Sequence, residues 1–164
     1  SRKESVAAIE GKIKTFSTPF VRNILRMIVD GEDTDTIREV FEREIDVEEE
    51  KLQSAAKIWA DAGGFAPTIG IIGAVLGLIH VMANLADPSQ LGKGIAVAFV
   101  ATIYGVASAN LIFLPIGNKI KNKIADSVQT KEMALDAALA ISKGKSPMVV
   151  EQMLSPYTRP ARVG

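Results

Sequence analysis

The sequence predicts an all-α membrane protein in which a hairpin of two transmembrane helices is attached to a cytoplasmic helical domain. Residues 62–86 and residues 94–118 each form a stretch of 25 residues without Asp, Glu, Lys or Arg. Only residues 87–93 separate them. At 1.5 Å per residue each stretch reaches roughly 37 Å, which exceeds a hydrocarbon core of about 30 Å. The rest of the chain is polar or amphipathic.

The alternative is a buried hairpin in a soluble protein. We favour the membrane because core helices of soluble proteins rarely lack charge on every face over this length. Lys119, Lys121 and Lys123 follow the second stretch, whereas the connecting loop contains only Lys93. The positive-inside rule therefore places both flanks in the cytoplasm and the loop on the periplasmic side.

Composition sets further limits. Basic and acidic residues number 19 each, so the net charge is zero, and there is no cysteine. The absence of cysteine excludes disulfides and thiolate metal sites. With no net positive charge, we expect no nucleic-acid partner. The chain starts without Met and with helix-forming sequence, so we expect upstream residues, possible earlier spans among them.

Residues 1–61 predict three helices. Residues 1–14 form a short amphipathic helix, and residues 20–29 form a second helix that Asp30-Gly31 closes. Thr36 and Glu39 form a capping box for a third helix that runs to residue 61, with a flexible break at Gly63-Gly64. The expected apolar face of this third helix consists of Ile37, Val40, Phe41, Ile45, Leu52, Ala55 and Ile58.

Residues 119–164 predict a cytoplasmic helix and tail. A helical stripe continues beyond the second span until Gly144. Ser146-Pro147 starts a short helix through residue 154, and the tail with Pro156 and Pro160 is expected to be loose. The stripe consists of Ile120, Ile124, Val128, Leu135 and Leu139.

Small residues recur at helical spacing inside both spans. Gly70, Gly73 and Gly77 follow Ala66 on one side of the first span, and Gly105 lies among Ala98, Thr102 and Ala109 on the second. Small side chains allow helix backbones to approach closely in lipid. The pattern favours helix packing over a pore lining, and both interpretations stay open for Thr102, whose hydroxyl can bond its own helix or face water or a partner.

No catalytic, metal-binding or cofactor-binding pattern is found. The lone His80 has no ligand cluster around it, and there is no nucleotide-binding glycine loop. Pro67 and Pro115 lie near the cytoplasmic ends of the spans and can kink them. Because the spans contain no ionisable Asp or Glu, any ion path through an assembly needs a carboxylate from another subunit.

Residues 63–79, GGFAPTIGIIGAVLGLI, and residues 98–105, AFVATIYG, resemble the third and fourth membrane helices of the MotA family of flagellar stator proteins. Residues 19–20, 29–31 and 42–46 extend this resemblance over most of the chain before the tail. The MotA family is part of the MotA/TolQ/ExbB proton channel superfamily. The resemblance implies that the first two spans are missing. It also implies a pentamer in the bacterial inner membrane, surrounding two copies of the single-span partner MotB and driving the rotor protein FliG.

The resemblance assigns roles to individual residues. Thr102 faces the pore, and Pro67 and Pro115 couple protonation to cytoplasmic movement. Arg2 and Glu10 have the spacing of the rotor-contacting pair, although Ser5 replaces a usual glycine, and Glu44 is a weaker candidate.

The same comparison addresses the coupling ion. Sodium-driven relatives usually have threonine where this chain has Ala74 and paired threonines where it has Ala101-Thr102. Because sodium needs several oxygen ligands, we predict protons as the transported ion.

Two alternatives are retained. An ExbB/TolQ-type subunit would also surround a single-span partner but power outer-membrane processes; the Arg2/Glu10 stretch and the long insert before the first span of the hairpin favour the stator. A passive scaffold would use its small-residue faces only for packing. Proton flux with and without the partner's aspartate would separate the scaffold from both motors.

Overall fold

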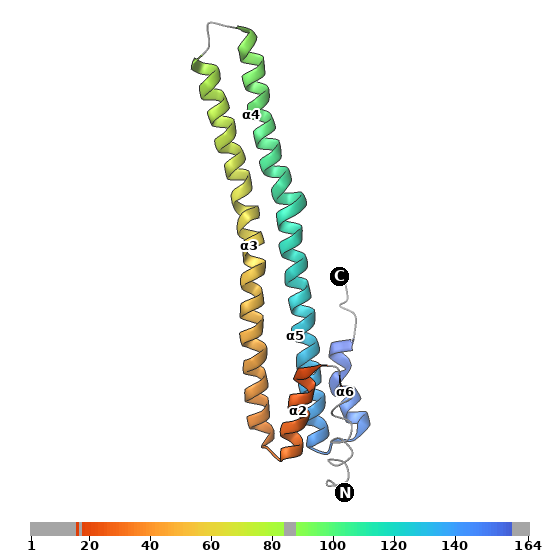
Figure 1. The fold of residues 1–164 in the computed structure, drawn as a ribbon. Helices are drawn as coiled ribbons and strands as arrows, with labels where there is room; N and C mark the ends of the chain where they lie inside the picture. The colour runs from red at the N-terminus through yellow and green to blue at the C-terminus, as the bar shows by residue number, and fades with distance from the viewer. Residues whose placement is uncertain (1–15, 17, 84–87, 159–164) are drawn as a thin grey trace. The chain divides into compact units, whose positions relative to one another are not determined.

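The computed structural model describes residue 16, residues 18–83 and residues 88–158, and these residues form helices joined by short turns (Figure 1). The predicted all-α class is confirmed. Within the chain two compact units form: the polar unit, which contains the described residues up to Glu50 and from Ile124, and the hairpin unit, Lys51–Lys123. The elements are α2 (Pro19–Asp30), α3 (Thr34–Ala83), α4 (Pro88–Ser108), the π-helical segment η2 (Ala109–Phe113), α5 (Leu114–Ser142) and α6 (Pro147–Thr158).

Helix α2 begins with a proline and ends with a glycine, as its sequence predicts. Pro19 occupies the first turn, where a missing N–H costs nothing. Gly31 has a φ of 84°, and its N–H donates to the Ile28 carbonyl at 3.3 Å. Because only glycine adopts this conformation without strain, the chain can reverse here into α3.

Helix α3 begins earlier than predicted. The Asp33 carboxylate accepts a hydrogen bond from the Asp35 N–H at 3.0 Å, and the Asp33 carbonyl accepts one from the Ile37 N–H at 2.9 Å. Asp33 therefore caps the helix, and the capping box predicted at Thr36 and Glu39 is wrong. A short acidic side chain directly before the first turn accepts hydrogen bonds from the N–H groups that have no partner at the start of a helix, as a capping box would.

The flexible break predicted at Gly63-Gly64 is also wrong. Helix α3 continues without interruption for 50 residues and includes both glycines and Pro67. A glycine costs only about 1 kcal/mol of helix propensity, and tertiary packing overrides it. The polar and apolar halves of α3 are thus one helix.

The polar unit has a core of large apolar side chains. Ile24 of α2, Ile37 of α3 and Leu135 of α5 are almost completely buried, and the rings of Phe20 and Phe41 meet edge to face at 5.3 Å. The other buried members of this core are Leu25, Ile28, Ile45, Ala138 and Leu139.

The apolar stripe predicted on α3 is correct only in its first half. Ile37, Phe41 and Ile45 are buried, whereas Val40 is exposed. In the second half Leu52, Ala55 and Ile58 are all exposed, so that part of the stripe is wrong for the single chain. On α5 the predicted stripe holds, with Ile124, Leu135 and Leu139 buried and Ile120 and Val128 partly buried.

Two boundaries differ from the expected ones. Helix α4 begins at Pro88, six residues before the predicted start of the second span, with proline again in the first turn. Helix α6 begins at Pro147 as predicted but continues through Pro156 to Thr158. The loose tail predicted at Pro156 is therefore wrong, and Pro160 lies outside the described residues.

Candidate functional site

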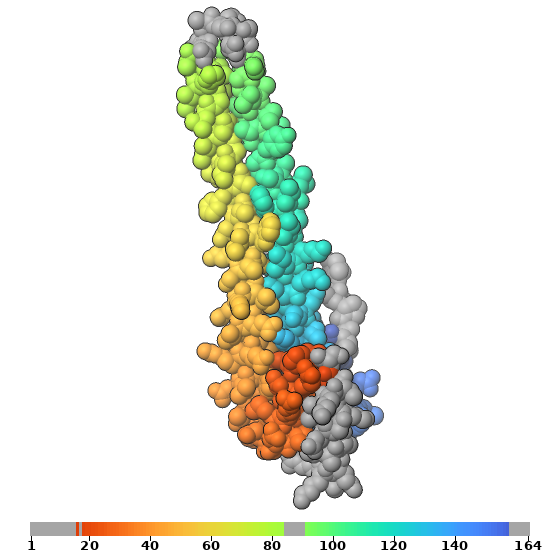
Figure 2. Space-filling model, in the orientation of Figure 1, coloured from red at the N-terminus to blue at the C-terminus, as the bar shows by residue number. Residues whose placement is uncertain are grey.

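The hairpin unit contains two antiparallel helices, the apolar half of α3 and α4, which lie side by side (Figure 2). They meet at Gly70 of α3 and Gly105 of α4. A Cβ atom on Gly70 would lie 2.9 Å from the Ala101 carbonyl oxygen, and one on Gly105 would lie 2.8 Å from the Ala66 carbonyl oxygen. The two main chains are therefore in direct contact, which only glycine permits.

Further small residues extend this contact toward the hairpin loop. A Cβ atom on Gly73 would lie 3.1 Å from the Ala101 Cβ, and one on Gly77 would lie 3.4 Å from the Ala98 Cβ. All four glycines proposed for packing, Gly70, Gly73, Gly77 and Gly105, thus face the partner helix of the same hairpin. Their small size therefore allows the two helices of one chain to pack closely.

Two residues predicted to line the ion path, Thr102 and Ala74, belong to the hairpin unit. Thr102 is half-buried, and its hydroxyl donates a hydrogen bond to the Ala98 carbonyl of its own helix at 3.2 Å. A hydroxyl that donates once still has lone pairs with which it can accept. Ala74 is half-buried on α3.

The two proline sites differ. Pro67 is half-buried within α3, which stays α-helical. Pro115 is exposed and follows the π-helical segment η2, in which the Leu114 N–H donates to the Ala109 carbonyl. Because proline has no N–H, the helix before it loses a hydrogen bond, and the wider π turn accommodates this defect.

Polar side chains surround η2 as well. The Asn110 amide donates to the Val106 carbonyl at 2.9 Å, and the Ser108 hydroxyl donates to the Gly105 carbonyl at 3.0 Å. Sequence reasoning missed this segment. The available signal was an asparagine five residues before a proline inside an apolar helix.

On the side of η2 away from the hairpin loop, the two helices of the hairpin unit remain in contact through larger side chains. The rings of Trp59 and Phe113 lie 6.3 Å apart, and the Leu114 side chain fills the space beside Gly63. Gly117 lies against the main chain of α3 near Ala56. A large side chain on one helix thus meets a glycine on the other.

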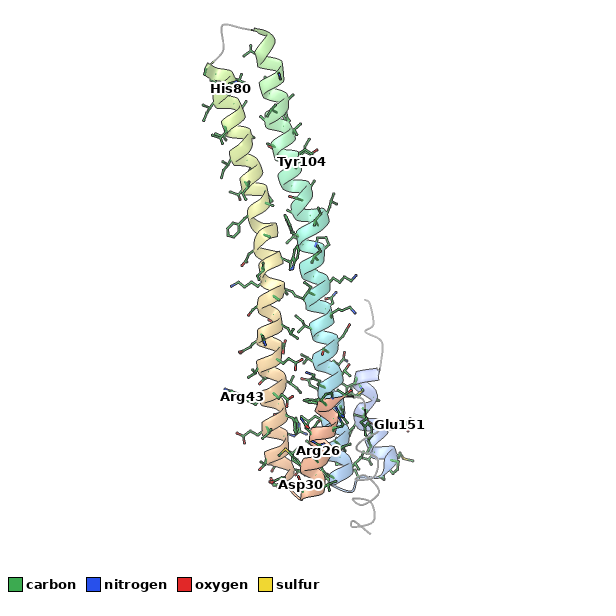
Figure 3. The ribbon with its side chains drawn as sticks, in the orientation of Figure 1. Arg26, Asp30, Arg43, His80, Tyr104 and Glu151 are labelled. Atoms are coloured by element: carbon green, nitrogen blue, oxygen red, sulfur yellow. The ribbon has the colours of Figure 1, made fainter. Side chains whose placement is uncertain are left out.

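The outer surface of the hairpin is apolar. Tyr104 is 72% exposed and Leu111 is 75% exposed, and His80 lies on α3 near the hairpin end (Figure 3). Two helices are long and apolar enough to cross a membrane, α3 and the continuous helix from Leu91 to Ser142. Exposed apolar surface of this extent marks a site of contact with lipid or with other proteins. Other exposed members include Phe65, Ile69, Leu76, Ile79, Phe99 and Ile103.

The charged candidates lie elsewhere in the chain. Arg2 and Glu10 fall outside the described residues. Glu44 is exposed on α3 within the polar unit. Among the residues that the structure describes, no cluster of three or more His, Asp or Glu side chains could hold a metal ion.

The polar unit contains an ion-pair network that the sequence did not reveal. The Arg38 guanidinium contacts the carboxylates of Glu42 and Asp136, each at 3.0 Å, and the Tyr157 hydroxyl donates to Asp136 at 2.9 Å. The hydrogen bond to Glu42, followed by that to Asp136, raises the pKa of Arg38. Burial, followed by the hydrogen bond to Asp136, raises the pKa of Tyr157 to about 12. The network borders a cavity of about 280 Å³ and fixes α6 to α5.

Comparison with known proteins gives a consistent result. The model of the MotA/TolQ/ExbB proton channel family matches residues 12–133. Motility protein A of Helicobacter pylori is 38% identical over 160 residues, which cover 98% of this chain and 62% of that protein. Motility protein A of Bacillus subtilis is 35% identical over 157 residues, which cover 96% of this chain and 58% of that protein.

Solved structures agree with these relatives. The structure of C. jejuni MotAB superimposes with a TM-score of 0.91 at 30% identity, covering 99% of this chain and 64% of that chain. The flagellar MotAB stator complex of Bacillus subtilis gives a TM-score of 0.85 at 35% identity, covering 94% of this chain and 61% of that chain. The chain therefore spans 58–62% of the length of these two curated relatives.

Proposed function

The chain belongs to the MotA/TolQ/ExbB proton channel family, and we propose that it forms part of a flagellar stator subunit that converts proton-motive force into torque. The observation that carries this proposal is the similarity to Motility protein A, which extends over nearly the whole chain and into the polar unit. An ExbB/TolQ-type role is the alternative, and it replaces the stator if the protein assembles and conducts protons but does not restore swimming.

The protein would lie in the bacterial inner membrane with both hairpin flanks in the cytoplasm. Lys119, Lys121 and Lys123 directly follow the second span, which supports this orientation. The complete subunit would include further spans, assemble as a pentamer and surround a single-span partner of the MotB type.

The hairpin has properties that suit a proton path completed by another subunit. Neither apolar stretch contains an Asp or Glu, so the proton-carrying carboxylate would come from the partner. Thr102 uses its hydroxyl hydrogen on its own helix, and its lone pairs remain available to accept from water or from a protonated carboxyl group.

The hairpin offers few oxygen ligands for sodium. Ala74 and Ala101 contribute no side-chain oxygen, so the Thr102 hydroxyl is the one side-chain oxygen among these three positions. A dehydrated sodium ion requires several oxygen ligands, so protons are the proposed ion. Swimming speed should follow the proton-motive force and stay constant when sodium is varied at constant proton-motive force; a dependence on sodium would reverse this assignment.

Coupling to the rotor would involve charged residues that precede the hairpin in the sequence. Arg2, Glu10 and, less strongly, Glu44 are the candidates for contact with FliG. Conformational coupling between membrane and polar parts would involve Pro67 and Pro115, since Pro115 follows the irregular segment η2. Single π turns inside α-helices are frequently found at functional sites.

The test is swimming of a stator-deleted strain that carries the full-length gene and its cognate partner. The native gene should restore swimming, and Arg2→Glu or Glu10→Lys should reduce it at unchanged membrane levels. If the native pair assembles and conducts protons but never restores swimming, the ExbB/TolQ-type function replaces the stator. If it assembles and conducts no protons with or without the partner's aspartate, the chain is a scaffold.

A further inference from the structure

One face of the helix that runs from η2 into α5 changes from apolar to basic. Leu111 is 75% exposed and Ile112 is 50% exposed, and Pro115, Lys119 and Lys123 beyond them are exposed as well. Residues three or four apart lie on the same side of a helix, so these side chains form one continuous surface. The outer stripe is defined as Leu111, Ile112, Pro115, Lys119 and Lys123.

The outer stripe lies on the side of its helix that is turned away from α3. Gly117 marks the opposite side, because a Cβ atom there would lie 3.4 Å from the Trp59 Cβ. At 3.6 residues per turn, Lys119 lies roughly 200° around the helix from Gly117. Lys119 and Lys123 form no ion pair within the part of the chain that the structure describes. Their ammonium groups can therefore bind an anion from outside the chain.

Trp59 indicates the boundary of the membrane independently of charge. It is 36% exposed on α3, level with Gly117, and its ring lies 6.3 Å from the Phe113 ring. Tryptophan is enriched where the hydrocarbon of a bilayer meets the headgroups. Because Gly117 lies between Pro115 and Lys119 in the sequence, the outer stripe passes from hydrocarbon to headgroups between these two residues.

The two lysines match the thickness of one headgroup layer. A bilayer is about 40–45 Å thick with its headgroups and about 30 Å without them, so each layer is roughly 5–8 Å thick. Lys119 and Lys123 are four residues apart, which is about 6 Å along the helix axis. Lysine side chains extend along apolar surface and place their charge at this depth. Both ammonium groups can therefore reach the phosphate of one lipid.

We propose that the outer stripe binds an anionic phospholipid, with its phosphate between Lys119 and Lys123 and its acyl chains on Leu111 and Ile112. An acidic protein segment would match only the lysines, whereas such a lipid matches the lysines and the apolar residues together. A zwitterionic headgroup carries an ammonium of its own, which the lysines repel, so the site prefers phosphatidylglycerol to phosphatidylcholine. The proposal rests on the membrane location in the proposed function and is independent of torque generation.

The lipid preference of the full-length protein, purified with its cognate partner, tests this site. Asn122 is exposed between the two lysines, and the chain contains no cysteine, so Asn122→Cys can carry a fluorescent label once any cysteine elsewhere in the complex is replaced by serine. The labelled complex is placed in phosphatidylcholine bilayers in which one lipid in five carries a nitroxide near the top of its acyl chain. Nitroxide-labelled phosphatidylglycerol should quench with a relative affinity at least about fivefold that of nitroxide-labelled phosphatidylcholine, the effect of one well-placed lysine.

Two pairs of substitutions that remove equal charge separate a site from general attraction. Lys119→Gln with Lys123→Gln should reduce the preference to less than about twofold at unchanged amounts of assembled complex. Lys143→Gln with Lys145→Gln removes the same charge from exposed lysines of the polar unit and should leave the preference unchanged. An equal loss in both pairs, or no loss in the first pair, would overturn the site.

A soluble anion distinguishes a lipid site from a phosphate site. Inorganic phosphate should reduce quenching by phosphatidylglycerol no more than chloride does at the same ionic strength, because phosphate has no acyl chains for the apolar half of the outer stripe. Displacement by phosphate alone would replace the lipid with a soluble anion. Equal quenching by both lipids in the native sequence would mean that another part of the assembly covers the outer stripe, which would also overturn the proposal.

The outcome is distinguishable from failure of the proposed function. If the native gene restores swimming and the labelled complex shows no lipid preference, the stator function stands and the lipid site is wrong. If the preference depends on Lys119 and Lys123 and swimming is never restored, the lipid site stands and the stator function is wrong.

Discussion

The hairpin unit and the polar unit are both built from packed helices, yet they use opposite kinds of residue. In the hairpin unit Gly70 and Gly105 bring two main chains together, and many large apolar side chains are exposed. In the polar unit Ile24, Ile37 and Leu135 fill the interior. The difference reflects the surroundings. In water the hydrophobic effect favours burial of large apolar side chains. In lipid, which is itself apolar, this driving force is absent, so helices associate through close packing of their backbones.

The largest expected effect on stability tests whether large apolar side chains stabilise the polar unit more than the hairpin unit. Leu135→Ala should lower the free energy of unfolding by about 2–5 kcal/mol, because it leaves a cavity in the core. Leu111→Ala, at a leucine that is 75% exposed, should change it by less than about 0.5 kcal/mol. Denaturant unfolding of the purified full-length protein in detergent measures both. Equal losses would contradict the comparison.

The next effect tests the close contact in the hairpin unit. Gly105→Ala should destabilise the hairpin by about 1–3 kcal/mol, because the new Cβ meets the Ala66 carbonyl oxygen at 2.8 Å. Gly64→Ala is the matched control, since a Cβ there meets nothing within 4 Å. The control should be neutral or stabilising by up to about 1 kcal/mol through helix propensity. Thermal unfolding in detergent should rank native and Gly64→Ala above Gly105→Ala.

A cross-link inside the hairpin sharpens the same contrast. Cysteines at positions 77 and 98 would have Cβ atoms about 3.4 Å apart, near the disulfide range. Gly77→Cys with Ala98→Cys should therefore form a bond within one chain, and no dimer should appear on a non-reducing gel. Because the two backbones are already in contact, swimming should persist after oxidation. Loss of swimming that a reductant reverses would show that these helices separate during the cycle.

The smallest effect concerns the hydrogen bond that fixes α6 in the polar unit. Tyr157→Phe removes the bond to Asp136 and should cost about 0.5–1.5 kcal/mol. The folded-state pKa of Tyr157 is raised from 10.0 to about 12, chiefly by burial. The contribution of the neutral phenol is therefore complete below pH 10 and is lost as the pH rises toward 12.

Unfolding of native protein and Tyr157→Phe between pH 8 and pH 12 measures this contribution. The difference in stability between the two should shrink as the pH rises through this range. A difference in stability that stays constant to pH 12 would contradict a raised pKa for Tyr157 in the folded protein. Gln129→Ala, which removes a longer 3.4 Å bond to the Tyr157 carbonyl, should leave the pH dependence unchanged.

Local features of the fold followed from the sequence where neighbouring residues determine them. The absence of charge over 25 residues predicted each long apolar helix, Gly31 predicted the end of α2, and Gly144 predicted the end of α5. These signals act over a few residues through desolvation, backbone conformation and hydrogen bonding. The cap at Asp33 was missed because several polar residues before α3 can serve the same role.

Other features depended on which helices meet. The sequence indicated that Gly70, Gly73, Gly77 and Gly105 permit close packing, but only the tertiary structure showed that they face one another within one hairpin. The exposure of Leu52 and Ile58 also had no local signal, because both belong to the same predicted apolar stripe as the buried Ile37 and Phe41.

The sequence by itself determined the helical class, the two apolar spans, the ends of several helices and the family. Only the tertiary structure decided the π-helical segment before Pro115, the pairing of Arg38 with Asp136 across 98 residues of chain, and the continuity of α3 through Gly63-Gly64. The physical reason is range: burial preference and backbone conformation are properties of adjacent residues, whereas register and long-range contacts depend on the simultaneous fit of all packed helices.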